Sequence, residues 1–219
     1  MSQAAAPVVA IDGPAGSGKS TVAREVAHAT GLAYLDTGAM YRAIAWGVMQ
    51  RDIDPADWPV VDDVLPQIAI SVGRDAVLVD GTDATREIRS PEVTRNVSAV
   101  AANPAVRAMM VGLQRQWIIE QGGGVLEGRD IGTVVAPDAA VKVFLTASPR
   151  ERARRRAAEF GGDVDAVEAE LIRRDQADST RDTSPLRPAD DAKHIDTTDY
   201  KIEEVVRLVV DLVTAAGVA

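Results

Sequence analysis

The stretch that most constrains the fold is a glycine-rich octapeptide, Gly13-Pro14-Ala15-Gly16-Ser17-Gly18-Lys19-Ser20. It fits the phosphate-loop pattern of Gly, any four residues, Gly-Lys and Ser or Thr. The apolar run at residues 8–11 precedes it and a helical pattern over residues 19–30 follows, which is the strand, loop and helix context that the pattern requires. The sequence therefore predicts an α/β domain that opens with a phosphate-binding unit.

The chemistry of this loop follows from its residue types. Glycines let backbone N–H groups converge on phosphate oxygens, and the N-terminus of the following helix adds a partial positive charge. We expect Lys19 to reach the β- and γ-phosphates of a nucleoside triphosphate, and the Ser20 hydroxyl to ligate Mg²⁺. Thr21 either helps to bind phosphate or only occupies the first helical turn.

Apolar runs that alternate with helical patterns predict a five-stranded parallel sheet of the doubly wound α/β class. The expected strands are residues 8–11, 33–35, 124–126, 141–145 and 193–195. Capping residues followed by proline mark helix starts at Ser148-Pro149, Ser90-Pro91 and Asn103-Pro104. The last helix is expected over about residues 201–216.

Residues 68–88 break this rhythm, because short apolar runs there are separated by turn signals such as Asp80-Gly81. They predict a small antiparallel sheet inserted into the core. We therefore expect a core domain of residues 1–54 and 104–219, an insert of residues 55–103, and a lid at about residues 150–182. The run Gly122-Gly123-Gly124 is interpreted as a flexible joint before the third core strand, or else as a turn only.

Composition narrows the possible partners. The net charge of −9 disfavours nonspecific binding to nucleic acid or to anionic membranes. The chain has no cysteine, no secretory signal pattern and no apolar run near the ~18 residues of a membrane span. These features are compatible with a cytoplasmic protein, and the acidic surface suits a monomer.

A phosphate loop alone indicates only that a nucleoside triphosphate binds. The chain lacks the Asn-Lys-x-Asp motif of switch GTPases, is short for a motor or transporter ATPase, and has no acidic residue at the end of the strand at 141–145. A small-molecule kinase fits what remains, and it needs a second site for an anionic substrate.

Two motifs at strand ends are candidates for that second site, because ligands bind at the carboxyl edge of such sheets. Residues 36–42 follow the second strand and open a helix, with Thr37 as its expected cap and Arg42 as a phosphate clamp. Residues 127–130 end the third strand, where Arg129 and Asp130 could bind a phosphate and a base edge.

Arginines downstream suggest a closing segment. Arg152, Arg154, Arg155 and Arg156 form a basic cluster, which is either a solvated helix face or part of a mobile lid that stabilises the transferred phosphate. Arg174, Asp178 and Arg181 have spacings of four and three. They share one helical face if a helix from about residue 163 extends that far, or else form a surface ladder of ion pairs.

Taken together, these motifs resemble those of the bacterial cytidylate kinases, the CMP/dCMP kinases of the nucleoside monophosphate kinase group. The resemblance covers nearly the whole chain. It is carried by residues 11–20, by Leu35-Asp36-Thr37-Gly38-Ala39-Met40-Tyr41-Arg42, by Glu127-Gly128-Arg129-Asp130-Ile131-Gly132-Thr133, and by Arg173-Arg174-Asp175 through Arg181. The predicted antiparallel sheet is similar to the enlarged monophosphate-binding insert of that family.

The resemblance implies ATP as donor with Mg²⁺, CMP and dCMP as acceptors, and direct in-line transfer. It implies roles in transfer for Lys19, Arg129, Arg181 and Arg155, and a possible Mg²⁺ contact for Glu127. The implied CMP-binding residues are Asp36, Thr37, Gly38, Tyr41, Arg42, Ser98, Arg107, Arg129, Asp130, Arg174, Asp178 and Arg181. Among them, Arg42, Arg129 and Arg181 would grip the phosphate. Ser98, Arg107 and Asp130 would read the cytosine, and Arg174 and Asp178 would contact the sugar.

Two alternatives stay open at this level. One is another small-substrate kinase, for example one acting on shikimate or dephospho-coenzyme A, and the set Ser98, Arg107 and Asp130 argues against it. The other is an ATP-binding regulator without catalytic activity, which the retained Lys19 and Arg129 disfavour.

Overall fold

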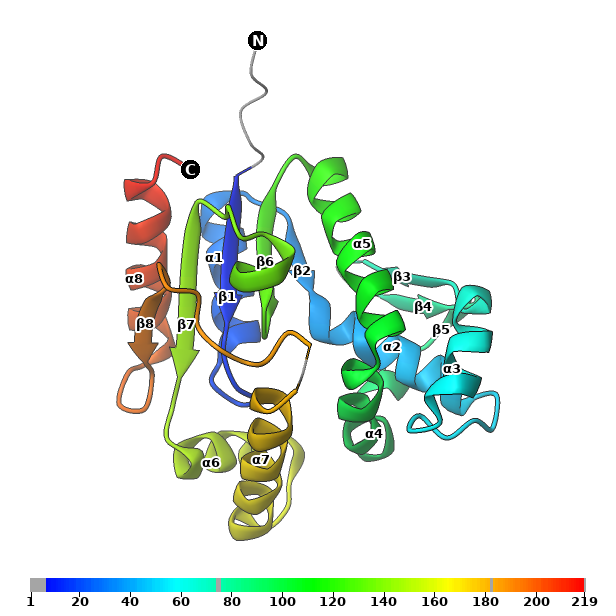
Figure 1. Cartoon of the computed structure of the whole chain (residues 1–219). Coiled ribbons are helices and arrows are strands. Elements are labelled where there is room, and N and C mark those ends of the chain that lie inside the picture. Colours follow the sequence, from blue (N-terminus) through cyan, green and yellow to red (C-terminus); the bar gives the residue numbers. More distant parts are fainter. Residues whose placement is uncertain (1–6, 74–75, 182, 219) are drawn as a thin grey trace. The chain divides into compact units, whose positions relative to one another are not determined.

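The computed structural model describes residues 7–73, 76–181 and 183–218, which belong to two compact units (Figure 1). The first unit combines the chain up to Tyr34 with the chain from Trp117 onward, and the second is Leu35–Gln116. The expected insert of residues 55–103 lies within the second unit. The proposed limits of the insert and of the lid stay predictions.

The larger sheet has five strands, in the order β2-β6-β1-β7-β8. They are β2 (Tyr34–Asp36), β6 (Gly124–Gly128), β1 (Val8–Asp12), β7 (Val141–Thr146) and β8 (Lys193–Asp196). The predicted five-stranded α/β fold is confirmed. In the parallel register of β1 with β6, Asp12 lies opposite Gly128, so the start of the phosphate loop and residues 127–130 are neighbours at the same sheet edge.

Two helices of the first unit, α1 (Lys19–Thr30) and α8 (Ile202–Ala215), pack on the sheet through one apolar cluster. The cluster joins strand residues such as Val9 and Ile11 to helix residues such as Val26 and Val209, all of them fully buried. Each such side chain contributes about 1.5–3 kcal/mol by leaving water. The helix α8 begins with a capping box in which the Lys201 N–H donates to Glu204 Oε2 at 2.8 Å.

The other helices of the first unit are α6 (Pro149–Phe160) and α7 (Val164–Ser179), which pack against each other. Side-chain oxygens of Ser148 and Asp163 cap their N-termini, as the sequence pattern predicts for Ser148. A single π-helical turn, η3 (Ile131–Val135), follows β6. The helix α7 ends at Ser179, so Arg181 lies beyond it rather than on the expected shared helical face.

Within the glycine run at 122–124, Gly122 forms a turn with open space at its Cβ position, whereas Gly123 and Gly124 pack closely. This close packing differs from the expected flexible joint. Gly124 has φ 150°, and a Cβ there would lie 2.7 Å from Trp117 Cη2 and 2.9 Å from the Ala33 carbonyl oxygen. At Gly123 a Cβ would lie 2.5 Å from the Pro7 carbonyl oxygen. Glycine is present because backbone and an indole ring occupy the space of a side chain.

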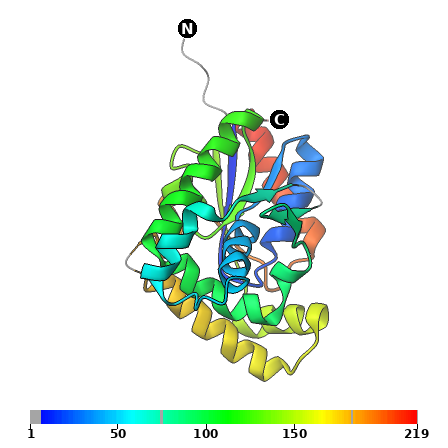
Figure 2. The same ribbon diagram turned by 90° about the vertical axis from the view of Figure 1, so that its right-hand side faces the viewer.

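The second unit contains a three-stranded antiparallel sheet, as predicted, of β3 (Ile70–Val72), β4 (Val77–Val79) and β5 (Thr82–Asp83). Its other elements are α2 (Thr37–Met49), α3 (Trp58–Val64), η1 (Leu65–Gln67), η2 (Glu87–Arg89), α4 (Pro91–Ala102) and α5 (Pro104–Gln121), the last turn of which belongs to the first unit. They can be followed from light blue to green in Figure 2. Asp80 and Gly81 both have positive φ, as a tight hairpin turn requires.

Two local expectations are corrected in this unit. The helix α2 is capped by Asp36 rather than by Thr37, because Asp36 Oδ1 accepts the Ala39 N–H at 2.8 Å and Thr37 is already helical. The segment near Glu87, at the end of the residues 68–88 that were expected to form the antiparallel sheet, is instead one turn of 3₁₀ helix. Among the described residues, none of the helices combines the length and apolar character needed to span a membrane.

Candidate nucleotide-binding site

The phosphate loop connects β1 to α1 with a backbone that only glycine accommodates at its first position. Gly13 has φ 147°, and a Cβ there would lie 2.0 Å from the Leu145 carbonyl oxygen of β7. Gly16 and Gly18 have φ 76° and 89°, and Gly18 is the N-cap of α1. In proteins, left-handed residues of this kind occur in concave runs of backbone N–H groups that bind anions.

Lys19 is buried at the start of α1, and its Nζ donates to the Pro14 carbonyl oxygen at 2.7 Å. Burial, and next the positive charge of Arg129, lower the pKa of Lys19 to about 7. The carboxylates of Glu127 and Asp12 act in the opposite direction. A phosphate bound beside Lys19 would favour its charged form and would therefore raise this pKa.

Ser20 and Glu127 lie side by side although 107 positions separate them in the sequence. Ser20 Oγ donates to Glu127 Oε2 at 2.8 Å, and the Tyr34 hydroxyl donates to Glu127 Oε1. The strand β7 has no acidic residue at its end. An acidic residue beside the phosphate loop comes instead from β6, which pairs with β1 on its other side. A hydroxyl beside a carboxylate offers the hard oxygen donors that Mg²⁺ prefers, so these residues fit the ion.

Sequence reasoning missed Asp12, a buried carboxylate at the end of β1. Its Oδ1 accepts the Ile131 N–H at 2.9 Å, and its Oδ2 accepts the Gly132 N–H at 2.8 Å. Burial raises the pKa of Asp12 to about 6, although these two backbone hydrogen bonds act to lower it. An acidic residue directly after four apolar strand residues was the available signal.

The residues predicted to bind an anion in the first unit converge on Asp178. Arg129 Nε lies 3.0 Å from Asp178 Oδ2, and Arg181 Nη1 lies 4.0 Å from Asp178 Oδ1. Burial acts to raise the pKa of Asp178, but Arg129 and then Arg181 outweigh it and hold this pKa below its usual value. Arg174 adds a smaller effect of the same sign. Asp178 therefore orients a cluster of guanidinium groups, and its predicted sugar contact stays a prediction.

The second unit gathers its own charged residues around Asp36. Besides capping α2, this carboxylate has Arg89 Nη2 at 3.4 Å and Arg42 Nη2 at 3.8 Å. A Cβ on Gly38 would lie within 3.2 Å of both Asp36 Oδ1 and Arg42 Nη2, so glycine makes room for this pairing. Arg89 was missed, because the sequence around it carries no motif.

The other predicted substrate residues are distributed over both units. Arg107 is buried in α5, where its Nη1 donates to the Ala101 carbonyl oxygen at 3.3 Å and its guanidinium lies 5.7 Å from the centroid of the Tyr41 ring. Ser98 is half-buried on α4, and Asp130 is buried two residues after the end of β6. Thr21 is exposed in the first turn of α1. A CMP site formed by residues of both units stays a prediction.

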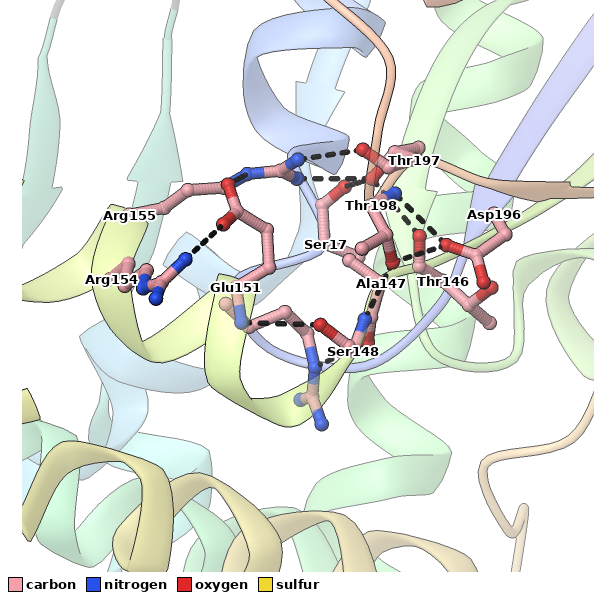
Figure 3. Close-up of polar contacts among 11 residues, drawn as sticks. Ser17, Thr146, Ala147, Ser148, Glu151, Arg154, Arg155, Asp196, Thr197 and Thr198 are labelled. Atoms are coloured by element: carbon pink, nitrogen blue, oxygen red, sulfur yellow. Dashed lines mark hydrogen bonds and ion pairs between the residues drawn. The ribbon is translucent and has the colours of Figure 1, made fainter. Parts of the chain in front are cut away.

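The four clustered arginines, which lie on α6 together with Arg150, have different environments. Arg152 is buried and ion-paired with Asp175 at 2.7 Å, so it does not belong to a solvated face. Figure 3 shows Arg155 beside the segment that follows β8: it donates to Glu151 Oε1 at 3.0 Å, to Thr197 Oγ1 at 3.0 Å and to the Thr197 carbonyl oxygen at 2.7 Å. Arg154 is exposed, and Arg156 lies over the Phe160 ring.

The chain is similar in sequence to known proteins over nearly its whole length. The profile of the family described as cytidylate kinase matches residues 9–215. A cytidylate kinase of Mycobacterium leprae (strain Br4923) is 51% identical over 211 residues, which cover 94% of this chain and 95% of that protein. A bifunctional pantoate ligase/cytidylate kinase of Synechococcus sp. (strain WH7803) is also 51% identical, over 94% of this chain but 44% of its own length. The chain thus spans less than half the length of the bifunctional relatives that it matches.

A solved structure with a similar fold is that of a gluconokinase from Sinorhizobium meliloti 1021. The two chains superpose with a TM-score of 0.52 over 98% of this chain and 96% of the other, at 14% identity. Within the described residues, no group of three or more His, Cys, Asp or Glu side chains is arranged to hold a metal ion.

Proposed function

The chain belongs to the cytidylate kinase family, and from this premise we propose that it transfers the γ-phosphoryl group of ATP directly to CMP and dCMP. One observation carries the proposal. The phosphate-loop Lys19 lies within electrostatic reach of Arg129 and Asp178, so the donor loop and a cluster of guanidinium groups share one unit. A kinase needs these two features together, because it must neutralise both the donor and the acceptor phosphates.

Lys19 and the backbone N–H groups of the loop would bind the phosphates of ATP. Ser20, with Glu127 beside it, would hold Mg²⁺, which would supply neutralisation of the negative charge of the ATP phosphates. The phosphate of the monophosphate would be held by Arg129 and Arg181, together with Arg42 from the second unit. Asp178 supports this role, because its carboxylate accepts a hydrogen bond from Arg129 Nε at 3.0 Å and lies 4.0 Å from Arg181 Nη1.

Base selection would depend on residues of opposite chemistry. Cytosine offers N3 and O2 as acceptors and its amino group as a donor. The Asp130 carboxylate would accept from the amino group, and Ser98 and Arg107 would donate to the ring. Arg174 and Asp178 would contact the sugar, with Asp36, Thr37, Gly38 and Tyr41 shaping the acceptor site around Arg42.

The transfer itself would need no covalent enzyme intermediate. An oxygen of the CMP phosphate is already a competent nucleophile and would attack the γ-phosphorus in line. The side chains would orient the two substrates and stabilise charge on the transferred group. Arg155 would add to this stabilisation only after leaving its hydrogen bonds to Thr197. The net charge of −9 supports our further proposal of a cytoplasmic monomer that binds neither nucleic acid nor membrane.

The test is a coupled ADP-release assay with Mg·ATP and a panel of CMP, dCMP, UMP, AMP, GMP and shikimate. We expect fast ADP release with CMP and dCMP and little with AMP, GMP or shikimate. Release with shikimate alone would indicate another small-substrate kinase. If no compound of the panel causes ADP release although ATP still binds, the protein would be an ATP-binding regulator.

The Asp130→Asn variant sharpens this test. Replacing the acceptor carboxylate with an amide should lower kcat/KM for CMP relative to UMP by about tenfold, since one charge-assisted hydrogen bond is lost. Asp138→Asn, an exposed residue of the same loop, is the matched control and should leave the ratio unchanged. An unchanged ratio in Asp130→Asn would reject the role of Asp130 in reading the base.

A further inference from the structure

Three carbonyl groups of the phosphate loop each accept a hydrogen bond from a side chain. Lys19 Nζ donates to the Pro14 oxygen at 2.7 Å, Arg152 Nη1 to the Ala15 oxygen at 2.9 Å, and Thr197 Oγ1 to the Ser17 oxygen at 3.2 Å. Lys19 belongs to the loop itself. Arg152 and Thr197 come from α6 and from the segment after β8, at sequence separations of 137 and 180.

Peptide geometry gives these contacts a consequence for phosphate binding. In a trans peptide the carbonyl and the N–H of the next residue point in opposite directions. A donor that holds the Ala15 carbonyl therefore also fixes the direction of the Gly16 N–H, and one that holds the Ser17 carbonyl fixes that of Gly18. We propose that Arg152 and Thr197 are positioning residues that turn the N–H groups of the phosphate loop toward the nucleotide.

Arg152 is itself held rigidly. It is 3% exposed, its Nε donates to the Ala147 carbonyl oxygen at 3.0 Å, and its Nη2 pairs with Asp175 at 2.7 Å. A Cβ on Gly16 would lie only 3.1 Å from Arg152 Cβ, so the arginine backs directly onto the loop. The remaining guanidinium nitrogen thus meets the Ala15 carbonyl in a fixed direction.

Thr197 is 3% exposed and connects three parts of the first unit (Figure 3). Its Oγ1 lies 3.0 Å from the Thr146 carbonyl oxygen and 3.2 Å from that of Ser17, and it accepts from Arg155 Nη1 at 3.0 Å. The single hydroxyl proton is shared between the two carbonyls. The Thr146 oxygen already accepts the Thr197 backbone N–H at 2.7 Å, so the Ser17 oxygen is the one that depends more on the hydroxyl.

Glycine makes such outside support necessary. Gly16 and Gly18 adopt left-handed conformations with φ 76° and 89°, and glycine populates positive and negative φ about equally. Nothing within these residues therefore selects the direction of their N–H groups. A loop without its carbonyl donors should sample rotated peptides, and phosphate should bind only the fraction in which the N–H groups converge.

The direct test measures phosphate binding without catalysis. Inorganic tripolyphosphate with Mg²⁺ is titrated calorimetrically into the full chain and into Thr197→Val, Thr197→Ser and the control Thr30→Val. Thr30 also donates to a backbone carbonyl, that of Val26 at 2.7 Å, but at the far end of α1. We expect Thr197→Val to weaken binding by about three- to tenfold, since one hydrogen bond is lost, and Thr197→Ser to restore it.

Kinetics provide a readout that a merely structural role would not move. In Thr197→Val the KM for ATP should rise by a similar factor while the KM for CMP stays constant. Unchanged tripolyphosphate affinity in a folded Thr197→Val, or an equal rise of both KM values, would overturn the proposal. This binding test is independent of the proposed acceptor, so its failure and that of CMP phosphorylation are distinguishable.

Arg155 must be separated from this effect, because it also contacts Thr197. The Thr197→Val change is therefore repeated in an Arg155→Ala background. If Thr197 acts through the Ser17 carbonyl, it should weaken tripolyphosphate binding by the same factor in both backgrounds. Loss of the effect in the Arg155→Ala background would assign it to Arg155 and overturn the role of Thr197 in the loop.

Arg152→Lys keeps the charge but cannot reproduce the fork of the guanidinium group. It should also weaken tripolyphosphate binding by at least about threefold. Asp175→Asn leaves the guanidinium donors of Arg152 in place and removes only their charged partner, so it should weaken tripolyphosphate binding less. This variant replaces Arg152→Lys in the test if Arg152→Lys does not fold. Full affinity in both variants would remove Arg152 from the proposal.

Discussion

Asp12 combines two properties at one residue, since it fixes a backbone turn and titrates near neutral pH. Its two oxygens accept the N–H groups of Ile131 and Gly132, which places the turn directly after Arg129 and Asp130. Because burial raises its pKa from 3.8 to about 6, the folded protein binds a proton there more tightly than the unfolded chain does. The consequence is a stability contribution that is present below pH 4 and lost as pH rises through about 6.

This consequence predicts how Asp12→Asn depends on pH. An asparagine cannot ionise, so the free energy of unfolding of the wild type should fall relative to the variant by up to about 3 kcal/mol between pH 4 and pH 7.5. Urea unfolding at both pH values measures the difference. A difference that stays constant across this range would show that Asp12 does not titrate as described.

At the scale of elements, close packing explains why position 124 is a glycine, which the sequence pattern alone did not explain. Gly124 begins β6 where the Trp117 ring and the Ala33 carbonyl occupy the position of a Cβ. Gly124→Ala should therefore destabilise the protein by roughly 2 kcal/mol through overpacking, measured by thermal or urea unfolding. Gly112→Ala, in α5 with open space around its Cβ position, is the control and should be neutral or stabilising. Equal effects of the two changes would contradict this account.

The elements themselves were largely predictable from the sequence. Buried parallel strands need continuous apolar runs, and the Ser-Pro and Asn-Pro pairs fix helix starts, so local signals sufficed for β1, β6, β7, α4 and α6. The errors occurred where a local pattern fits two structures. Asp36 and Thr37 are both good caps, and only the contact of Asp36 with the Ala39 N–H distinguishes them. The arginines of α6 left a solvated face and a lid both open, because sequence alone does not show that Arg152 pairs with Asp175 of α7.

At the scale of the whole molecule, the site depends on pairs of residues that are distant in sequence. Ser20 with Glu127 and Asp12 with Ile131 are more than one hundred positions apart. Strand order brings them together, because β6 pairs with β1. Motifs predicted that residues 13–20 and 127–130 share a sheet edge, but not which side chains would touch. Arg89 and Thr197 were therefore missed, since their contacts come only from the fold, whereas the position of Asp12 after four apolar strand residues was a signal in the sequence.

The central claim is that the γ-phosphoryl group of ATP moves directly to CMP. The most direct measurement incubates the protein with Mg²⁺, CMP and ATP labelled at the γ-phosphorus, and then separates the products. The account predicts that the label appears in CDP, and that Lys19→Met lowers this transfer by at least about 100-fold while the protein stays folded. Label found only in inorganic phosphate, or transfer undiminished in Lys19→Met, would contradict the account.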